Sequence, residues 1–153
     1  MNPLSITQGE LIYQADIQIT DIVEFGFSME EISSGEVAIP PEGARFDQPF
    51  SGSVHGPKLK GRMDGIDHIY VRADGRFELH IHATIRTEDG HNISFSSNGV
   101  SNQINETKEA QLTAAASLFS SSHSYKWLNK LQIWAIGVLD TETGKAYVKA
   151  YSI

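Results

Sequence analysis

The feature that most constrains the fold is a stretch of strict alternation between apolar and polar residues near the middle of the chain. From Phe77 to Ile85 the odd positions are apolar, and from Glu78 to Arg86 the even positions are polar. A two-residue repeat predicts a β-strand whose side chains divide between two faces. The Asp89-Gly90 pair that follows supplies the positive φ angles of a tight turn, so we expect the strand to end in a hairpin.

Similar segments recur along the chain. Residues 11–20 alternate cleanly, residues 46–54 and 91–97 read as extended pieces, and residues 131–139 and 146–153 read as two closing strands. Short strands separated by Asp-Gly and Gly-rich turns are typical of all-β proteins, and closing the sheet into a barrel removes its exposed edges. We therefore expect residues 1–153 to form one antiparallel, lipocalin-like (calycin or allene-oxide-cyclase-like) β-barrel domain.

Residues 106–120 are ambiguous. Asn105 is a good helix cap, and the segment from Glu106 to Phe119 is rich in helix-forming residues. A resemblance to a known family, set out below, implies a strand here instead. Because tertiary context overrides local propensity, we favour a strand.

Composition excludes several classes of function. A formal charge of −7 and the absence of a Lys/Arg cluster argue against nucleic acid as a partner. With no cysteine, the chain has no disulfides, no thiolate metal ligands and no cysteine nucleophile. No apolar run is long enough to span a membrane, and the first residues do not read as a secretory signal. We expect a cytoplasmic protein that does not bind membranes.

Several short motifs, taken in order, resemble one known family. They are His55-Gly56-Pro57-Lys58-Leu59-Lys60-Gly61, Gly65-Ile66-Asp67, Ala73-Asp74-Gly75, Thr84-Ile85-Arg86-Thr87-Glu88-Asp89-Gly90 and Tyr125-Lys126-Trp127-Leu128-Asn129. From Leu11 onward the chain resembles domain-of-unknown-function family 3237, which consists of small antiparallel β-barrels from bacteria and fungi. The resemblance implies the fold and leaves the activity open.

The chain departs from the family pattern at four positions that are histidine here. The family has an acidic residue before Gly-Pro, an aromatic after the Gly-x-Asp step, and an acidic and a basic residue on the central strand. The corresponding residues in this chain are His55, His68, His80 and His82. The resemblance also implies a strand across 111–120, where this chain is unusually rich in alanine.

The histidines suggest general acid–base chemistry in a barrel cavity. His80 and His82 share one strand face, roughly 7 Å apart, and imidazole exchanges protons near neutral pH. Asp67 would orient one of these rings. The candidate catalytic residues are His80, His82, Asp67 and His68, and the candidate substrate-binding residues are His55, Thr84, Tyr125 and Trp134. This set suits a lyase, isomerase or cyclase that acts on a small hydrophobic or aromatic metabolite and needs no cofactor.

Three alternatives stay open at the level of sequence. The barrel could bind a small ligand without catalysis. His80, His82 and His68 could instead ligate zinc or iron, although the spacing to the next acid, Glu88, does not fit the cupin pattern. The polar face could also simply face solvent. We expect a small-molecule ligand as the partner, and a surface rich in strands favours a homo-oligomer such as a homodimer.

Overall fold

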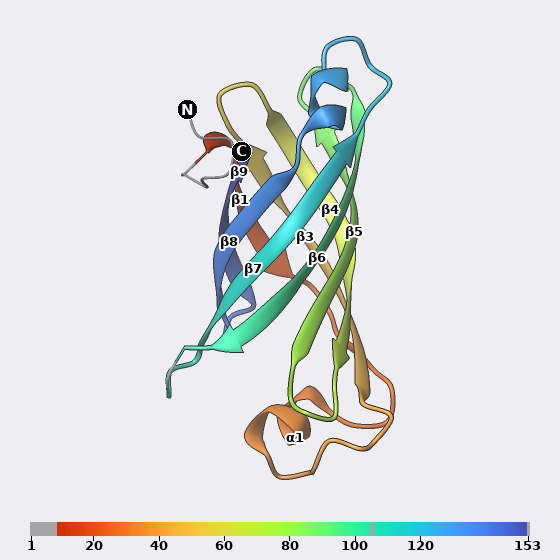
Figure 1. The fold of residues 1–153 in the computed structure, drawn as a ribbon, viewed down its shortest axis with the longest axis vertical. Helices are drawn as coiled ribbons and strands as arrows, with labels where there is room; N and C mark the ends of the chain where they lie inside the picture. The colour runs from red at the N-terminus through yellow and green to blue at the C-terminus, as the bar shows by residue number, and fades with distance from the viewer. Residues whose placement is uncertain (1–8, 105, 153) are drawn as a thin grey trace, which may run out of the picture.

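The alternating segments form eight long strands that close into an antiparallel barrel in the computed structural model, which describes residues 9–104 and 106–152 (Figure 1). The strands are β1 (Glu10–Ile19), β3 (Ala44–His55), β4 (Lys60–Val71), β5 (Phe77–Thr87), β6 (Asn92–Gln103), β7 (Glu109–Phe119), β8 (Ile133–Asp140) and β9 (Lys145–Ser152). A short strand, β2 (Val23–Glu24), pairs with β3. The predicted all-β antiparallel barrel is confirmed.

The order of the strands shows how the barrel closes. Neighbouring strands run β1-β9-β8-β7-β6-β5-β4-β3, and β1 also pairs with β3. In the β1–β3 seam Ile17 lies opposite Gly52 and Gln14 opposite His55. Strand β1 therefore lies between β3 and β9, and the ring has no free edge.

The ambiguous segment is a strand, as favoured above. Ten residues of β7, from Ala110 to Phe119, pair with β6, and eight of its residues pair with β8. Strand partners on both sides satisfy the backbone of this segment, which explains why its helix-forming composition does not decide the structure. Asn105 lies outside the described residues.

Each end of the barrel is covered by the chain between two strands. At the upper end in Figure 1, the 3-10 helix η1 (Lys126–Lys130) places Leu128 in the core, where it has no exposed surface. At the lower end, the short helix α1 (Met29–Ser34) inserts Ile32. A capping box between Ser28 and Glu31 starts α1, because each residue's side chain accepts from the other's backbone N–H. Within the described ranges, no helix has the length and apolar character needed to cross a membrane.

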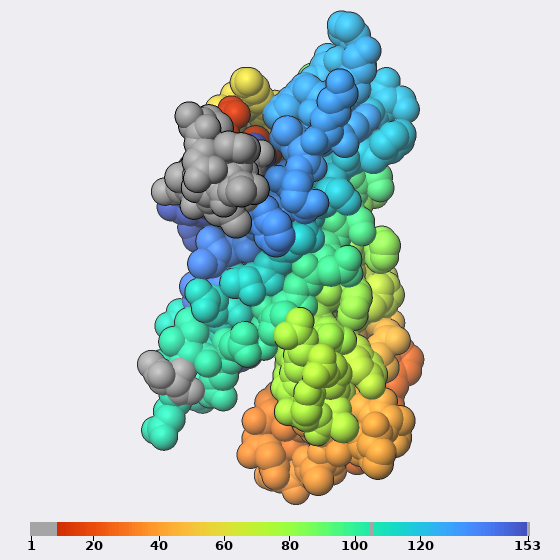
Figure 2. Space-filling view, viewed as in Figure 1, coloured from red at the N-terminus to blue at the C-terminus, as the bar shows by residue number. Residues whose placement is uncertain are grey.

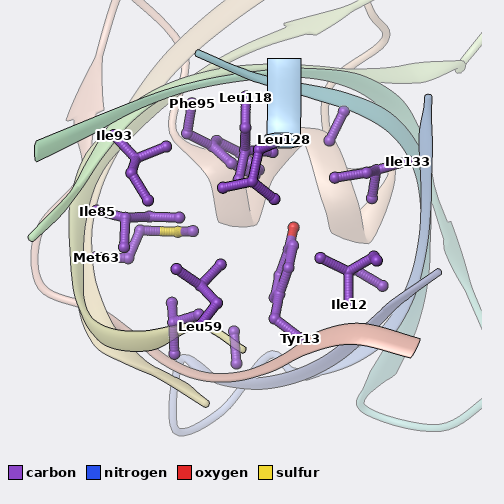
Figure 3. Close-up of a cluster of buried hydrophobic side chains, with 14 of the residues drawn as sticks. Ile12, Tyr13, Leu59, Met63, Ile85, Ile93, Phe95, Leu118, Leu128 and Ile133 are labelled. Carbon is purple, nitrogen blue, oxygen red and sulfur yellow. The ribbon is translucent and has the colours of Figure 1, made fainter. Parts of the chain in front are cut away.

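Apolar side chains on the inner face form two clusters, one at each end of the barrel. We call them the η1-end core and the α1-end core. Figure 3 shows side chains of the η1-end core, which includes Ile12, Tyr13, Leu59, Met63, Ile85, Ile93, Phe95, Leu118, Leu128 and Ile133. The buried members of the α1-end core are Ile32, Ala44, Phe46, Ile69, Val71 and Leu79.

Candidate functional site

One carboxylate breaks the apolar pattern of the inner face, and it is Asp67. On β4 the residues that alternate with it, Met63, Ile69 and Val71, are buried in the two cores. Asp67 lies opposite Ile81 of β5, which packs against the η1-end core. Since directly opposite residues of antiparallel strands share a face, Asp67 points into the barrel, between the two cores.

The surroundings of Asp67 change its acidity. Burial raises its pKa from 3.8 to about 6, while a hydrogen bond from the His80 backbone and the nearby His80 and His68 rings partly oppose the rise. Asp67 forms no salt bridge with any other residue in the described part of the chain. A carboxyl group with a pKa near 6 has appreciable amounts of both its acidic and its basic form near neutral pH.

The β4–β5 ladder is interrupted beside this carboxylate. Pairing runs from Gly61–Thr87 to Asp67–Ile81 and resumes at Tyr70–Glu78. Within the gap, the backbone N–H of His80 donates to Asp67 Oδ1 over 3.0 Å, and His80 Nδ1 lies 3.2 Å from the carbonyl oxygen of His68. Two side-chain contacts thus join the strands where the regular pairing is missing, and the one from the His80 N–H holds Asp67 Oδ1.

The histidines do not line the barrel, so of the two possibilities left open for their strand face, the outward one describes this structure. Phe77, Leu79, Ile81 and Ile85 of β5 occupy the interior, so the alternate residues His80 and His82 point outward. The hydrophobic gain from burying the apolar face decides which face of the strand is inside. His68 is also on the outer face, with Nδ1 2.8 Å from Asp47 Oδ1 and its ring centre 6.4 Å from that of His82.

The predicted substrate-binding residues are dispersed and do not form one pocket. His55 lies on the outer face 3.2 Å from Asp16, and Thr84 is on the outer face of β5. Trp134 is on the outer face of β8 and is 49% exposed. Tyr125 belongs to the segment that covers the η1 end, where its hydroxyl donates to Asp89 Oδ1 over 2.6 Å.

The structure does not favour the alternative of a metal site formed by His80, His82 and His68. Across residues 9–104 and 106–152, no three His, Asp or Glu side chains are grouped closely enough to hold a metal ion. The only catalytic candidate on the inner face is Asp67.

Two inward polar residues near Asp67 were not predicted. Gln48 of β3 lies opposite Asp67, and Ser97 of β6 lies opposite Ile81 and is only 4% exposed. On the same strand faces, Gln48 lies between Phe46 and Phe50, and Ser97 lies between Phe95 and Gly99. That alternation is visible in the sequence and could have identified both residues.

The whole barrel resembles solved structures of low sequence identity. A protein of unknown function from Clostridium acetobutylicum is 22% identical with a TM-score of 0.77, over 96% of this chain and 99% of that one. A β-barrel-like protein from Acinetobacter baumannii is 21% identical with a TM-score of 0.76, over 99% of both chains. An enzyme from Penicillium herquei is 20% identical with a TM-score of 0.65, over 96% of this chain and 97% of that one.

At the level of sequence, the chain matches a family model. No protein of the curated set matches the chain. The model described as "Protein of unknown function (DUF3237)" matches residues 23–153, which is most of the chain and includes every long strand except β1. The chain therefore belongs to the DUF3237 family.

Proposed function

We propose that this protein is an enzyme in which Asp67 transfers protons to and from a small hydrophobic or aromatic molecule. The reaction class is that of a lyase, isomerase or cyclase that needs no cofactor. The observation that carries the proposal is the carboxyl group of Asp67, which points into the barrel without a salt-bridge partner among the described residues and has a pKa of about 6. Carboxyl groups with a pKa raised toward neutrality by an apolar environment are effective general acids and bases.

The layer around Asp67 supports this chemistry. Gln48 and Ser97 add hydrogen-bonding groups on the inner face, and Gly99 and Ala114 further along the wall are small. The η1-end core lies on one side of this layer and the α1-end core on the other. A ligand held in this layer would contact a few polar groups within an otherwise apolar wall, which is the usual make-up of a small-molecule site.

The α1 end offers the more open approach to this layer. Phe77, Ser101 and Leu112 lie opposite one another across β5, β6 and β7 at this end, and all three are only partly buried. Figure 2 shows the surface notched at the lower end, between the β6–β7 hairpin and the segment that joins β4 to β5. The resemblance to the Penicillium herquei enzyme supports catalysis as a use of this fold.

The proposed mechanism uses the two carboxyl oxygens differently. The backbone N–H of His80 holds Oδ1 at 3.0 Å, which leaves Oδ2 to face the ligand. In its ionised form Asp67 removes a proton from an acidified carbon or hydroxyl of the substrate. It then returns that proton to another atom of the same molecule, so atoms and charge balance over the cycle. His80 is a positioning residue in this scheme, because it acts on the substrate only through Asp67.

Hydrogen–deuterium exchange tests the proposal with a set of probe compounds in place of the natural substrate. A panel of small hydrophobic and aromatic carbonyl compounds is incubated with the protein in D2O, and exchange at the carbon next to the carbonyl is followed by NMR. We expect Asp67→Asn to slow exchange by about 100-fold or more. Asp64→Asn is the matched control, because Asp64 lies on the outer face of the same strand and pairs with Arg86.

The result also separates this proposal from a binding barrel without catalysis, which the apolar lining of the interior would also suit. Exchange at the wild-type rate in Asp67→Asn would contradict the role of Asp67. Compounds that bind the wild-type protein, as seen by ligand-observed NMR, but show neither exchange nor conversion would favour the binding barrel.

A further inference from the structure

The outer surface of β7, β8 and β9 carries a concentration of exposed apolar side chains. Trp134, Ile136 and Val138, which we call the apolar stripe, run along β8 with 49%, 46% and 39% of their surfaces exposed. Tyr147 on the outer face of β9 is 43% exposed. The outer surfaces of β7 and β8 face the viewer in Figure 2. Contiguous apolar surface of this kind marks interaction sites.

The two flanks of the apolar stripe differ in size and charge. Level with Trp134, Ile136 and Val138, the β7 flank presents Ala115, Thr113 and Gln111, and it ends in Glu109. At the same levels the β9 flank presents Tyr151, Lys149 and Tyr147, and it ends in Lys145. The β7 flank thus has the smaller side chains and ends in an acidic residue. The β9 flank has the larger side chains and ends in a basic residue.

A hollow lies on the small flank. It has a volume of about 370 Å³ and is lined by Asn98, Thr113, Ala114, Ala115, Trp134 and Ala135. Its lining contains no charged side chain, and the Trp134 ring forms one side. An aromatic ring inserted over Ala115 would pack against the Trp134 ring and against the methyl group of Ala115.

We propose that this face binds a second copy of the same chain through a twofold axis that lies in the interface, parallel to β8. This rotation places the β7 flank of each copy on the β9 flank of the other. Ala115 and the hollow then meet Tyr151 of the partner subunit, and Glu109 meets Lys145 of the partner subunit. The apolar stripe packs on its own counterpart, with the two sheets aligned face to face as in a β-sandwich, roughly 10 Å apart.

Self-complementarity is what favours a second copy over an unrelated partner. The face itself holds both halves of each match, a hollow and a ring at one level and an acid and a base at another, on opposite sides of the same stripe. An isologous twofold interface requires this arrangement. The Asp140 carboxylates of the two copies come near the axis, where Lys145 side chains from both subunits flank them.

Sedimentation of the full chain tests the oligomeric state. We expect the wild-type protein to sediment as a dimer of twice 16.9 kDa, and Ile136→Lys to sediment as a folded monomer. Ile66→Lys is the control, because Ile66 is a comparably exposed residue on the outer face of β4, away from the stripe, and that variant is expected to stay dimeric. Ala115→Trp, which fills the hollow, provides a second monomeric variant in case the lysine impairs folding. A wild-type monomer or trimer, or a dimer that survives both changes, would overturn the proposal.

Charge reversal tests the direction of the axis. Glu109→Lys and Lys145→Glu are each expected to weaken the dimer by about tenfold, because each places like charges opposite one another across the interface. The double variant restores the opposite-charge match, so its dissociation constant is expected to return to within about threefold of wild type. If the double variant is no tighter than the single ones, Glu109 and Lys145 do not meet in the dimer, and the proposed axis is wrong.

Discussion

Asp67 makes the stability of the fold depend on pH. Its pKa is about 6 in the folded protein and 3.8 without the fold. Because the folded-state value is the higher one, the stability that Asp67 contributes is fully present below pH 3.8 and is lost as the pH rises through about 6. At pH 7.5 the buried charge costs about 3 kcal/mol of stability.

Asp67→Asn should therefore raise stability at pH 7.5 by about 2 kcal/mol, since the amide keeps an oxygen for the His80 N–H and carries no charge. The gain should shrink as the pH is lowered from 7.5 to 4. Urea unfolding at several pH values measures both effects, with Asp64→Asn as the control. A destabilised Asp67→Asn at pH 7.5 would mean that the charged form is well solvated in the folded protein. A variant that is more stable and less active would fit a functional carboxylate.

For single residues, the sequence predicted which side chains share a strand face better than it predicted which face points into the barrel. The two-residue repeat correctly placed His80 and His82 on one face, and the structure confirms that they share it. It did not place that face inside, because the alternate residues from Phe77 to Ile85 are apolar and gain more from burial. The same reasoning applied to β4 would have singled out Asp67 as the inward residue among Met63, Ile69 and Val71.

Among the elements, the segment that covers the η1 end contacts the β5–β6 turn through Tyr125. The Tyr125 hydroxyl donates to Asp89, and the Tyr125 ring lies edge-on to His91 at 5.5 Å. Tyr125→Phe keeps the ring and removes the hydrogen bond, so we expect Tm to fall by about 3 °C. Tyr70→Phe is the matched control, because the Tyr70 hydroxyl donates to an exposed backbone carbonyl, that of Glu42. An equal fall in Tm for the two variants would show that the hydrogen bond to Asp89 stabilises the protein no more than the exposed one to Glu42.

Helix α1 is short, and its capping box contributes much of its local stability. Ser28 accepts from the backbone of Glu31 over 3.0 Å. Ser28→Ala is expected to cost about 1 kcal/mol locally, which corresponds to roughly fivefold faster amide exchange in α1. Hydrogen exchange followed by mass spectrometry measures this, with Ser33→Ala as the control. Unchanged exchange over residues 29–34 would show that the packing of Ile32 alone holds the helix.

The elements show where local sequence is a sufficient guide and where it is not. The Asp-Gly pairs at 74–75 and 89–90 predicted their turns correctly, with Gly75 and Gly90 at φ +93° and +90°. The stretch around Thr113 and Ala116 has the composition of a helix, and only the ladders on β6 and β8 make it a strand. That information resides in distant segments, so a local pattern cannot supply it.

For the whole molecule, the β1–β3 seam closes the barrel, and Gly52 allows the two strands to approach. A Cβ atom at this position would lie 2.1 Å from the carbonyl oxygen of Asp16 and 2.8 Å from the side chain of Ile17. Gly52→Ala should therefore push the strands apart and cost about 3 kcal/mol. Urea unfolding and amide exchange in β1 measure the effect, with the outward Ser53→Ala as the control. A variant as stable as wild type would show that β1 can shift without opening the seam.

The sequence indicated a closed barrel but not which strands meet at the seam. The pairing of β1 with both β3 and β9 depends on the number and tilt of all the strands, and these are properties of the complete ring. For the same reason, the sequence could not predict which residues flank the apolar stripe. Ala115 and Tyr151 become its two sides only once β7, β8 and β9 are in register.

The place of β1 between β3 and β9 also sets an order of events during synthesis. Among the strands that the structure describes, β1 is synthesised first, yet one of its two partners, β9, is synthesised last. Until residues 145–152 emerge, β1 and β8 each have an edge that lacks its partner strand, β9. The nascent chain already contains the apolar stripe of β8 at that stage. Such edges are the surfaces through which incomplete β-proteins aggregate. A chain arrested before residues 145–152 emerge would thus present a barrel without β9, which depends on chaperones for its solubility.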